Sequence, residues 1–223
     1  MLPSSFARHA LVAALLAFSP ATALATDFGI GIAGGTTGGS IEAKVGVNDR
    51  IMLRGGYNYI EFSGDLETNG IDYDGDFELS NAGAFVDIAP FGNAFILSGG
   101  AYIGPKEADL VATPAGNVRI GGMEFTPAEV GSLFGSVEFN DFAPYVGIGY
   151  DSFLTASGNW SFSARAGVMF TGSADVELTS ANGLLSQDPV LLAEIRDEVL
   201  QIEEDAEDYK YYPVLRVGVT RRF

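Results

Sequence analysis

The chain has 223 residues, enough for one domain with a substantial core, and it contains no cysteine and one histidine. Disulfide crosslinks and thiol chemistry are therefore excluded, and a net charge of −17 argues against a nucleic-acid partner. The mean hydropathy is nevertheless +0.20, and the chain is rich in Gly (29), Phe (16) and Tyr (9). This mixture is typical of short strands that alternate between lipid and a crowded interior.

The first 25 residues predict a secretory signal peptide. Arg8 and His9 precede the apolar run of residues 10–18, and Ala23-Leu24-Ala25 offers small residues for cleavage after Ala25. The run is too short for a membrane-crossing helix, which needs about 20 residues. The mature domain would comprise residues 26–223, with 11 basic and 29 acidic residues, a net charge of −18 and no histidine.

The C-terminal segment sets the phase of a barrel. Between residues 211 and 223, Val217, Val219 and Phe223 share one face, whereas Arg216 and Arg222 lie on the other. A membrane barrel turns such an apolar face towards lipid and the polar face towards its lumen. The same alternation recurs in other segments of the chain.

Four segments follow this rule, and filling in the others gives eight strands, which predicts an all-β fold: an eight-stranded antiparallel up-and-down transmembrane β-barrel. Short periplasmic turns are expected to alternate with long extracellular loops at 63–76, 105–136 and 172–210. The predicted strands are Phe28–Ala33, Ser40–Asn48, Ile51–Phe62, Phe77–Ile88, Ala94–Gly104, Val137–Tyr150, Trp160–Thr171 and Tyr211–Phe223.

The fourth predicted strand has an ambiguous phase. An outward direction for Phe77 and Leu79 does not carry through to Ala82, Ala84 and Val86 unless a bulge intervenes. The sequence therefore predicts an irregularity in this strand.

Two of the long loops contain helix signals. Thr126-Pro127-Ala128-Glu129 matches a capping box with proline in the first turn. Asp188-Pro189 begins an amphipathic helix, expected over Pro189–Asp208 at the cell surface, either as a lid over the barrel mouth or as a partner-binding surface. Its acidic side would comprise Glu194, Asp197, Glu198, Glu203, Glu204, Asp205, Glu207 and Asp208.

The signal peptide, the alternating strands and the aromatic C-terminus resemble the small outer-membrane barrels of the OmpA, OmpX and OmpW type. Arg216, Gly218 and Phe223 look like the assembly signal that such proteins present to the barrel-insertion machinery, although Arg221 stands where an apolar residue is usual. Gly56-Tyr57-Asn58-Tyr59 is also similar to a short sequence motif in a group of uncharacterised outer-membrane proteins. We expect a monomer in the outer membrane, in contact with its lipid and lipopolysaccharide.

Six charged residues fall on the inward faces of the predicted strands. Because side chains fill the interior of an eight-stranded barrel, these charges must pair with one another. They could form a gated ion path or, as the favoured interpretation, a sealed polar core. The residues of this predicted lumen network are Glu42, Lys44, Arg54, Arg165, Arg216 and Arg222.

The sequence predicts no catalytic, metal or cofactor site. The mature chain lacks the histidine on which Ser-His mechanisms and many metal sites depend. Asp72-Tyr73-Asp74-Gly75-Asp76 looks like a calcium loop, but its glycine is fourth rather than sixth, so a solvated loop rim is favoured.

The expected function is therefore that of an integral outer-membrane barrel with a structural or surface-interaction role in the cell envelope. One alternative is a narrow channel for small or apolar solutes. A second alternative, a soluble periplasmic β-barrel that binds a ligand, would require apolar residues on the inward face.

Overall fold

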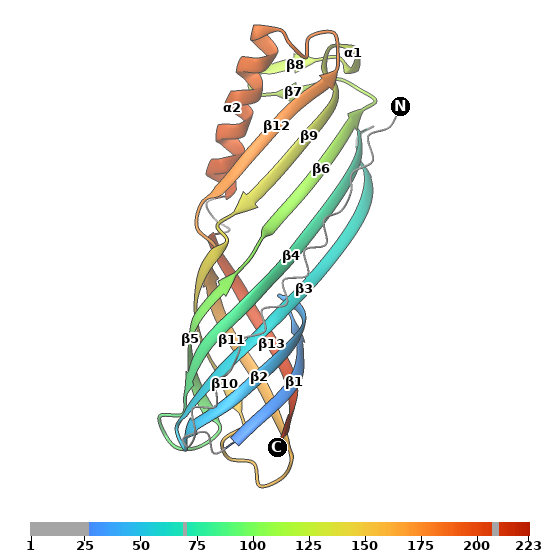
Figure 1. The fold of residues 1–223 in the computed structure, drawn as a ribbon. Coiled ribbons are helices and arrows are strands. Elements are labelled where there is room, and N and C mark those ends of the chain that lie inside the picture. Colours follow the sequence, from blue (N-terminus) through green and yellow to red (C-terminus); the bar gives the residue numbers. More distant parts are fainter. Residues whose placement is uncertain (1–26, 69–70, 207–209) are drawn as a thin grey trace, which may run out of the picture.

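The chain folds into a narrow barrel that continues at one end into an open sheet (Figure 1). The computed structural model describes residues 27–68, 71–206 and 210–223. The predicted signal peptide, residues 1–25, lies outside the described residues, as do Glu207 and Asp208 of the predicted acidic helix side. The side chains of Asp72, Asp74 and Asp205 also lie outside this description.

Eight antiparallel strands close the barrel, which confirms the predicted fold class. The strands are β1 (Asp27–Gly35), β2 (Gly38–Asn48), β3 (Ile51–Thr68), β4 (Ile71–Ile88), β5 (Phe95–Ile103), β10 (Phe142–Asp151), β11 (Trp160–Phe170) and β13 (Tyr211–Arg222). Their order around the ring is β4-β3-β2-β1-β13-β11-β10-β5, and a β4–β5 pairing completes the closure. Three short turns and the C-terminus lie at one end of the barrel (Figure 1).

Side chains alternate between the two faces of the barrel wall as predicted. Outward apolar residues are exposed, among them Ile32, Ile41 and Val217, while inward polar residues such as Lys44 and Arg165 are buried. This is the distribution of a barrel surrounded by lipid. A soluble ligand-binding barrel would need the opposite distribution, with apolar residues inside and polar residues outside.

Exposed aromatic side chains lie near both ends of the barrel wall. Phe28, Trp160 and Phe223 lie at the short-turn end, and Tyr57 and Tyr59 lie towards the opposite end. Membrane barrels carry a girdle of aromatic residues at each interface between lipid and water. Two such levels are the usual boundary markers of a barrel in a bilayer.

The barrel continues beyond the ring as a five-stranded sheet, which we call the extension. It adds β6 (Lys106–Pro114), β9 (Gly131–Phe139) and β12 (Ala174–Asn182) to the far halves of β3 and β4, in the order β12-β9-β6-β4-β3. The prediction of long loops at 63–76, 105–136 and 172–210 is therefore wrong in detail, because each contains strand. These strands lie beyond the lipid-facing wall, so they do not carry the outward apolar signal on which the prediction relies.

The predicted strand Val137–Tyr150 corresponds to β10 but begins too early, because Val137 belongs to β9 and Asn140-Asp141 separates β9 from β10. At this point Lys106 Nζ donates hydrogen bonds to the carbonyls of Gly104 (2.8 Å), Asn140 (2.8 Å) and Asp141 (2.9 Å). One ammonium group thus joins the end of β5, where the chain leaves the ring, to Asn140-Asp141, where it re-enters the ring at β10.

The fourth strand has no bulge, and its phase differs from the prediction. β3 and β4 keep a continuous register from the Ile51–Ile88 pair to the Thr68–Ile71 pair. Leu79 is buried on the same face as Asn81 and Phe85. An outward direction for Phe77 and Leu79 is therefore wrong: both belong to the inward face, at the level where the barrel opens into the extension.

Two helices lie in the extension, α1 (Pro127–Val130) and α2 (Pro189–Ala206). The predicted capping box is present, since the Glu129 carboxylate accepts hydrogen bonds from the backbone N–H and the hydroxyl of Thr126, each 2.8 Å long. Among the described residues, neither helix has both the length and the apolar character needed to cross a membrane.

Helix α2 lies along β12 (Figure 1) and is also attached to the hairpin of β7 (Val118–Ile120) and β8 (Met123–Phe125). The N–H groups of Gly121 and Gly122 donate 2.7 Å hydrogen bonds to Glu198 and Glu194. An apolar cluster joins the helix, the hairpin and α1: Val118, Ile120, Phe125, Val130, Leu191 and Ile195.

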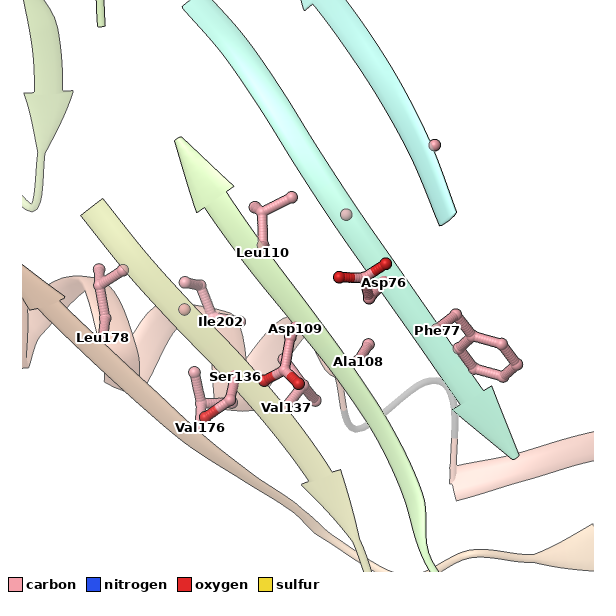
Figure 2. Close-up of a pocket in the computed structure, with 13 residues that line it drawn as sticks. Asp76, Phe77, Ala108, Asp109, Leu110, Ser136, Val137, Val176, Leu178 and Ile202 are labelled. Carbon is pink, nitrogen blue, oxygen red and sulfur yellow. The ribbon is translucent and has the colours of Figure 1, made fainter. Parts of the chain in front are cut away.

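Farther along the helix, a cavity of about 470 Å³ is lined by the extension and by Ile202 of α2 (Figure 2). Phe77, Val137 and Leu178 are among the apolar residues that line it.

The phase of β13 can be tested with Val217→Arg. Because Val217 faces outward in the middle of a barrel strand, an arginine there should cost about 2–4 kcal/mol of folding free energy and impair insertion. Urea titration of protein folded into lipid vesicles measures the change. Val190→Arg, at an exposed position of α2, is the matched control and should insert normally; equal stability of the two variants would contradict the membrane-facing assignment.

Candidate functional site

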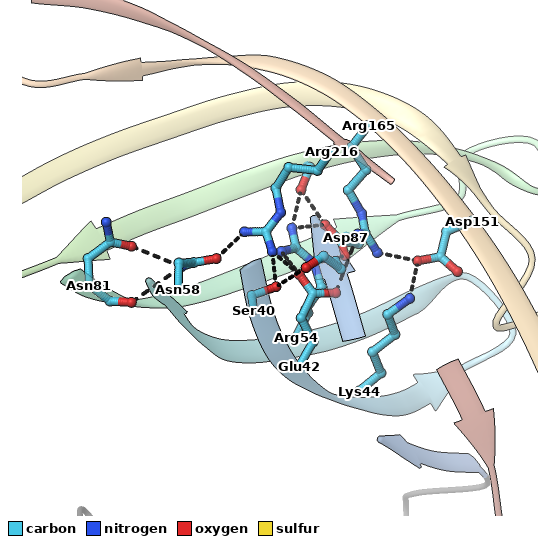
Figure 3. Close-up of polar contacts among 12 residues, drawn as sticks. Ser40, Glu42, Lys44, Arg54, Asn58, Asn81, Asp87, Asp151, Arg165 and Arg216 are labelled. Atoms are coloured by element: carbon cyan, nitrogen blue, oxygen red, sulfur yellow. Dashed lines mark hydrogen bonds and ion pairs between the residues drawn. The ribbon is translucent and has the colours of Figure 1, made fainter. Parts of the chain in front are cut away.

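The barrel lumen holds a connected group of charged side chains, which we call the lumen network (Figure 3). At its centre Glu42 of β2 lies near three guanidinium groups: Arg216 Nη2 at 3.2 Å, Arg54 Nη1 at 3.5 Å and Arg165 Nη1 at 3.6 Å. Period-two alternation on four different strands directs these side chains inward. A single carboxylate therefore joins β2, β3, β11 and β13.

Two further carboxylates complete the ionic part of the network. Asp151 accepts a hydrogen bond of 2.7 Å from Lys44 Nζ and another from Arg165 Nη2. Asp87 accepts a 2.9 Å hydrogen bond from Arg54 Nε and another from the Ser98 hydroxyl. Each carboxylate thus contacts a cation from another strand, as burial of charge requires.

A neutral branch extends the network from Arg216. Its guanidinium donates to Asn58 Oδ1 and to the Ser40 hydroxyl, and Asn58 Nδ2 donates to Asn81 Oδ1 at 2.9 Å. The ionic side chains are at most 4% exposed. Among these described residues, four cations face three carboxylates, so the neutral branch solvates the excess positive charge.

An aromatic layer covers the network on the side of the extension. Phe85, Tyr102 and Tyr145 contact one another edge to face, with ring centroids 4.9–5.7 Å apart, and the Arg54 guanidinium lies 4.0 Å above the Phe85 ring. Such contacts are favourable beyond simple burial. Ala143, Met169, Val214 and Tyr212 complete this apolar layer.

Inward glycines make room for these rings. A Cβ at Gly83 would lie 2.5 Å from the Phe85 ring, and a Cβ at Gly147 would lie 2.2 Å from the Tyr145 hydroxyl. Real Cβ atoms essentially never approach so closely. Any side chain at these positions would displace the layer.

The opposite end of the lumen is filled by Phe153, a residue of the turn between β10 and β11 that is fully buried. Its ring lies 5.9 Å from Lys44 Nζ and 5.6 Å from the Arg222 guanidinium. Arg222 Nη2 forms an ion pair of 2.8 Å with Asp27 at this end. Aromatic groups thus lie on both sides of the lumen network.

The structure brings together five of the six residues predicted for the lumen: Glu42, Lys44, Arg54, Arg165 and Arg216. Arg222 does not join them, because it lies at the short-turn end and pairs with Asp27, beyond Phe153. Sequence reasoning missed Asp87 and Asp151. Asp87 alternates with outward Val86 and Ile88 and could have been found by its phase, whereas the sequence pattern assigns Asp151 to a turn.

The three residues of the predicted assembly signal lie on the last strand. Phe223 faces outward and its N–H donates a 2.8 Å hydrogen bond to the Phe28 carbonyl. Gly218 faces inward against Ala33 and Ser163, and Arg216 lies in the lumen network. Arg221, the departure from the motif, has its guanidinium 5.9 Å from the Trp160 ring and 5.6 Å from the Phe223 ring, at the barrel end where a charge costs little.

Comparison with known proteins places this geometry among solved barrels. No protein-family profile and no curated protein matches the chain. Acinetobacter baumannii CarO2 matches with 27% identity and a TM-score of 0.58, over 88% of this chain and 98% of that one. Acinetobacter baumannii CarO matches with 25% identity and a TM-score of 0.58, over 87% and 97%. The chain is an outer-membrane β-barrel protein.

The central position of Glu42 can be tested with Glu42→Gln. Removing this carboxylate leaves four buried cations facing two carboxylates, Asp87 and Asp151, and leaves Arg216 with neutral partners only among the described residues, so the free energy of unfolding should fall by about 3–5 kcal/mol. Arg216→Met is the control, because it removes the excess cation and leaves Glu42 with Arg54 and Arg165. Urea unfolding of both variants in vesicles should show the smaller loss for Arg216→Met, and the opposite order would contradict the charge balance described above.

Proposed function

We propose that this outer-membrane barrel does not conduct and that it serves a structural or surface-interaction role in the cell envelope. The supporting observation is the filled lumen, in which the network lies between the Phe85 layer and Phe153. A continuous solute path would need both aromatic groups to move and the buried ion pairs to separate. Breaking one buried pair costs several kcal/mol.

The extension supports the surface part of this proposal. Short turns of outer-membrane barrels face the periplasm, so the opposite end, with the extension and α2, faces outward from the cell. The extension is organised by strand pairing, an apolar cluster and helix contacts rather than by irregular loops. A folded structure presents a defined surface, whereas a loop would lose conformational entropy on binding.

A narrow channel is the second candidate, and one observation favours it. Ser161 Oγ, Ser163 Oγ, Arg165 Nε and Arg216 Nε are buried and have no hydrogen-bond partner within the described part of the chain. They lie on the adjacent strands β11 and β13, where Arg165 pairs with Arg216 in the register. Buried polar groups usually have partners, so this polar seam marks the place where a path would open.

Planar-bilayer recording separates the two candidates. Wild-type protein should give no unitary conductance steps, whereas the combined substitution Tyr145→Ala, Phe85→Ala and Phe153→Ala should give them, because it shortens the aromatic groups on both sides of the network. Phe91→Ala, at an exposed turn position, is the control and should remain silent. Conductance steps from folded wild-type protein would favour the channel.

Surface exposure of α2 can be tested with Glu204→Cys, because the chain has no native cysteine. Glu204 is exposed on the helix, so a membrane-impermeant maleimide should label it on whole cells. Asn93→Cys, exposed in a short turn, should be labelled only after the outer membrane is ruptured. The reverse pattern would place the extension in the periplasm and overturn the surface role.

A further inference from the structure

The cavity of the extension is not used by the lumen network. Its volume of about 470 Å³ falls within the range of small-molecule sites. Apolar side chains from four strands and one helix line it (Figure 2): Phe77, Ala108, Leu110, Val137, Val176, Leu178 and Ile202. Leu110 remains 43% exposed there, so the structure leaves apolar surface uncovered on a concave face.

A row of paired positions that includes three glycines crosses the floor of the cavity. Gly64 pairs with Gly75, Gly75 with Leu110, and Leu110 with Gly135, on the neighbouring strands β3, β4, β6 and β9. Glycine inside a strand weakens it and often marks a place where a ligand or another backbone approaches closely. Three glycines in one row therefore need an explanation.

The surroundings of these glycines differ from those of the lumen glycines. A Cβ at Gly135 would have Leu178 Cδ1 as its nearest neighbour at 3.7 Å, and a Cβ at Gly75 would have Leu110 Cδ1 at 3.5 Å. A Cβ at Gly64 would meet no atom within 4 Å. In the lumen, by contrast, a Cβ at Gly83 would collide with the Phe85 ring. The glycine row thus leaves space that the described side chains do not fill.

The charge around the cavity restricts what could occupy this space. Asp76 and Asp109, paired across β4 and β6, are the ionisable residues among those that line it, and by strand alternation their carboxylates lie behind its floor, on the opposite face of the sheet from Gly75 and Leu110. The next residue of α2 after Ile202 is Glu203, and the whole chain carries a net charge of −17. Such a field disfavours an anionic ligand and favours a neutral or cationic one.

We propose that the cavity between α2 and the glycine row binds a small apolar molecule that carries no negative charge. The apolar body of the ligand lies over Gly75 and Gly135, in contact with Leu110, Leu178 and Ile202. The inference deepens the proposed surface role by naming a ligand class, but it does not depend on whether the lumen conducts.

The experiment uses the full mature barrel in lipid nanodiscs and the uncharged dye N-phenyl-1-naphthylamine, whose fluorescence rises in apolar surroundings. The dye should show a saturable component above that of empty nanodiscs. Gly135→Leu and Gly75→Leu, which fill the cavity from two different strands, should each weaken this binding roughly tenfold. The anionic dye 8-anilino-1-naphthalenesulfonate should bind wild-type protein roughly tenfold more weakly than the neutral dye.

Gly99→Leu is the matched control, because Gly99 lies on the outer wall of β5 and a Cβ at this position would meet no atom within 4 Å. It should bind the neutral dye within about twofold of wild type. Heat-modifiable migration verifies that each variant is folded. Absence of a saturable component, or unchanged binding in a folded Gly135→Leu or Gly75→Leu variant, would overturn the proposal, and equal binding of the anionic dye would overturn its charge preference. Failure of the proposed non-conducting role would appear separately, as conductance steps.

Discussion

Close packing of aromatic rings against inward glycines is the constraint on which the rest of this barrel depends. Phe85 fits because Gly83 and Gly100 flank it, and a Cβ at either position would lie within 2.6 Å of its ring. Tyr145 is accommodated in the same way by Gly147 and Gly167. With this layer in place, the charged groups beneath it are shielded from solvent. They must therefore satisfy one another, which makes Glu42, Asp87 and Asp151 necessary partners of the four buried cations.

Period-two alternation was sufficient to predict the lipid-facing wall and most of the lumen. It placed Glu42, Lys44, Arg54, Arg165 and Arg216 inward because a strand with one face in lipid cannot shift by one residue without exposing charge to lipid. The pattern could not reveal which inward side chains meet, because the level of a residue along the barrel axis depends on how the strands are staggered. Arg222 shows this limit: it has the correct phase but lies at the end of the lumen, beyond Phe153. Phe153 itself belongs to a turn, where alternation carries no information.

The extension could not be predicted by the same reasoning. Outside the lipid, neither face of a strand must be apolar, so β6 and β9 lack the signal that defines the barrel strands. Their pairing is also non-local, because β4 exchanges β5 for β6 along its length and β9 pairs with β12. Lys106 stabilises the divergence through three carbonyls that become neighbours only after folding. Local signals were accurate for α1 and α2, whose capping and spacing are properties of consecutive residues.

The inward glycines show how the packing of the barrel differs from that of the extension. Gly83 of the lumen and Gly75 of the extension each precede a phenylalanine by two residues, and both lie on the inward face of β4. Their neighbours distinguish them: the missing side chain at Gly83 is replaced by the Phe85 ring, whereas the space at Gly75 opens into a cavity. One strand thus passes from a packed interior to an unfilled concave surface along its length. The packed part closes the barrel, and the unfilled part forms the cavity in which we propose that a ligand binds.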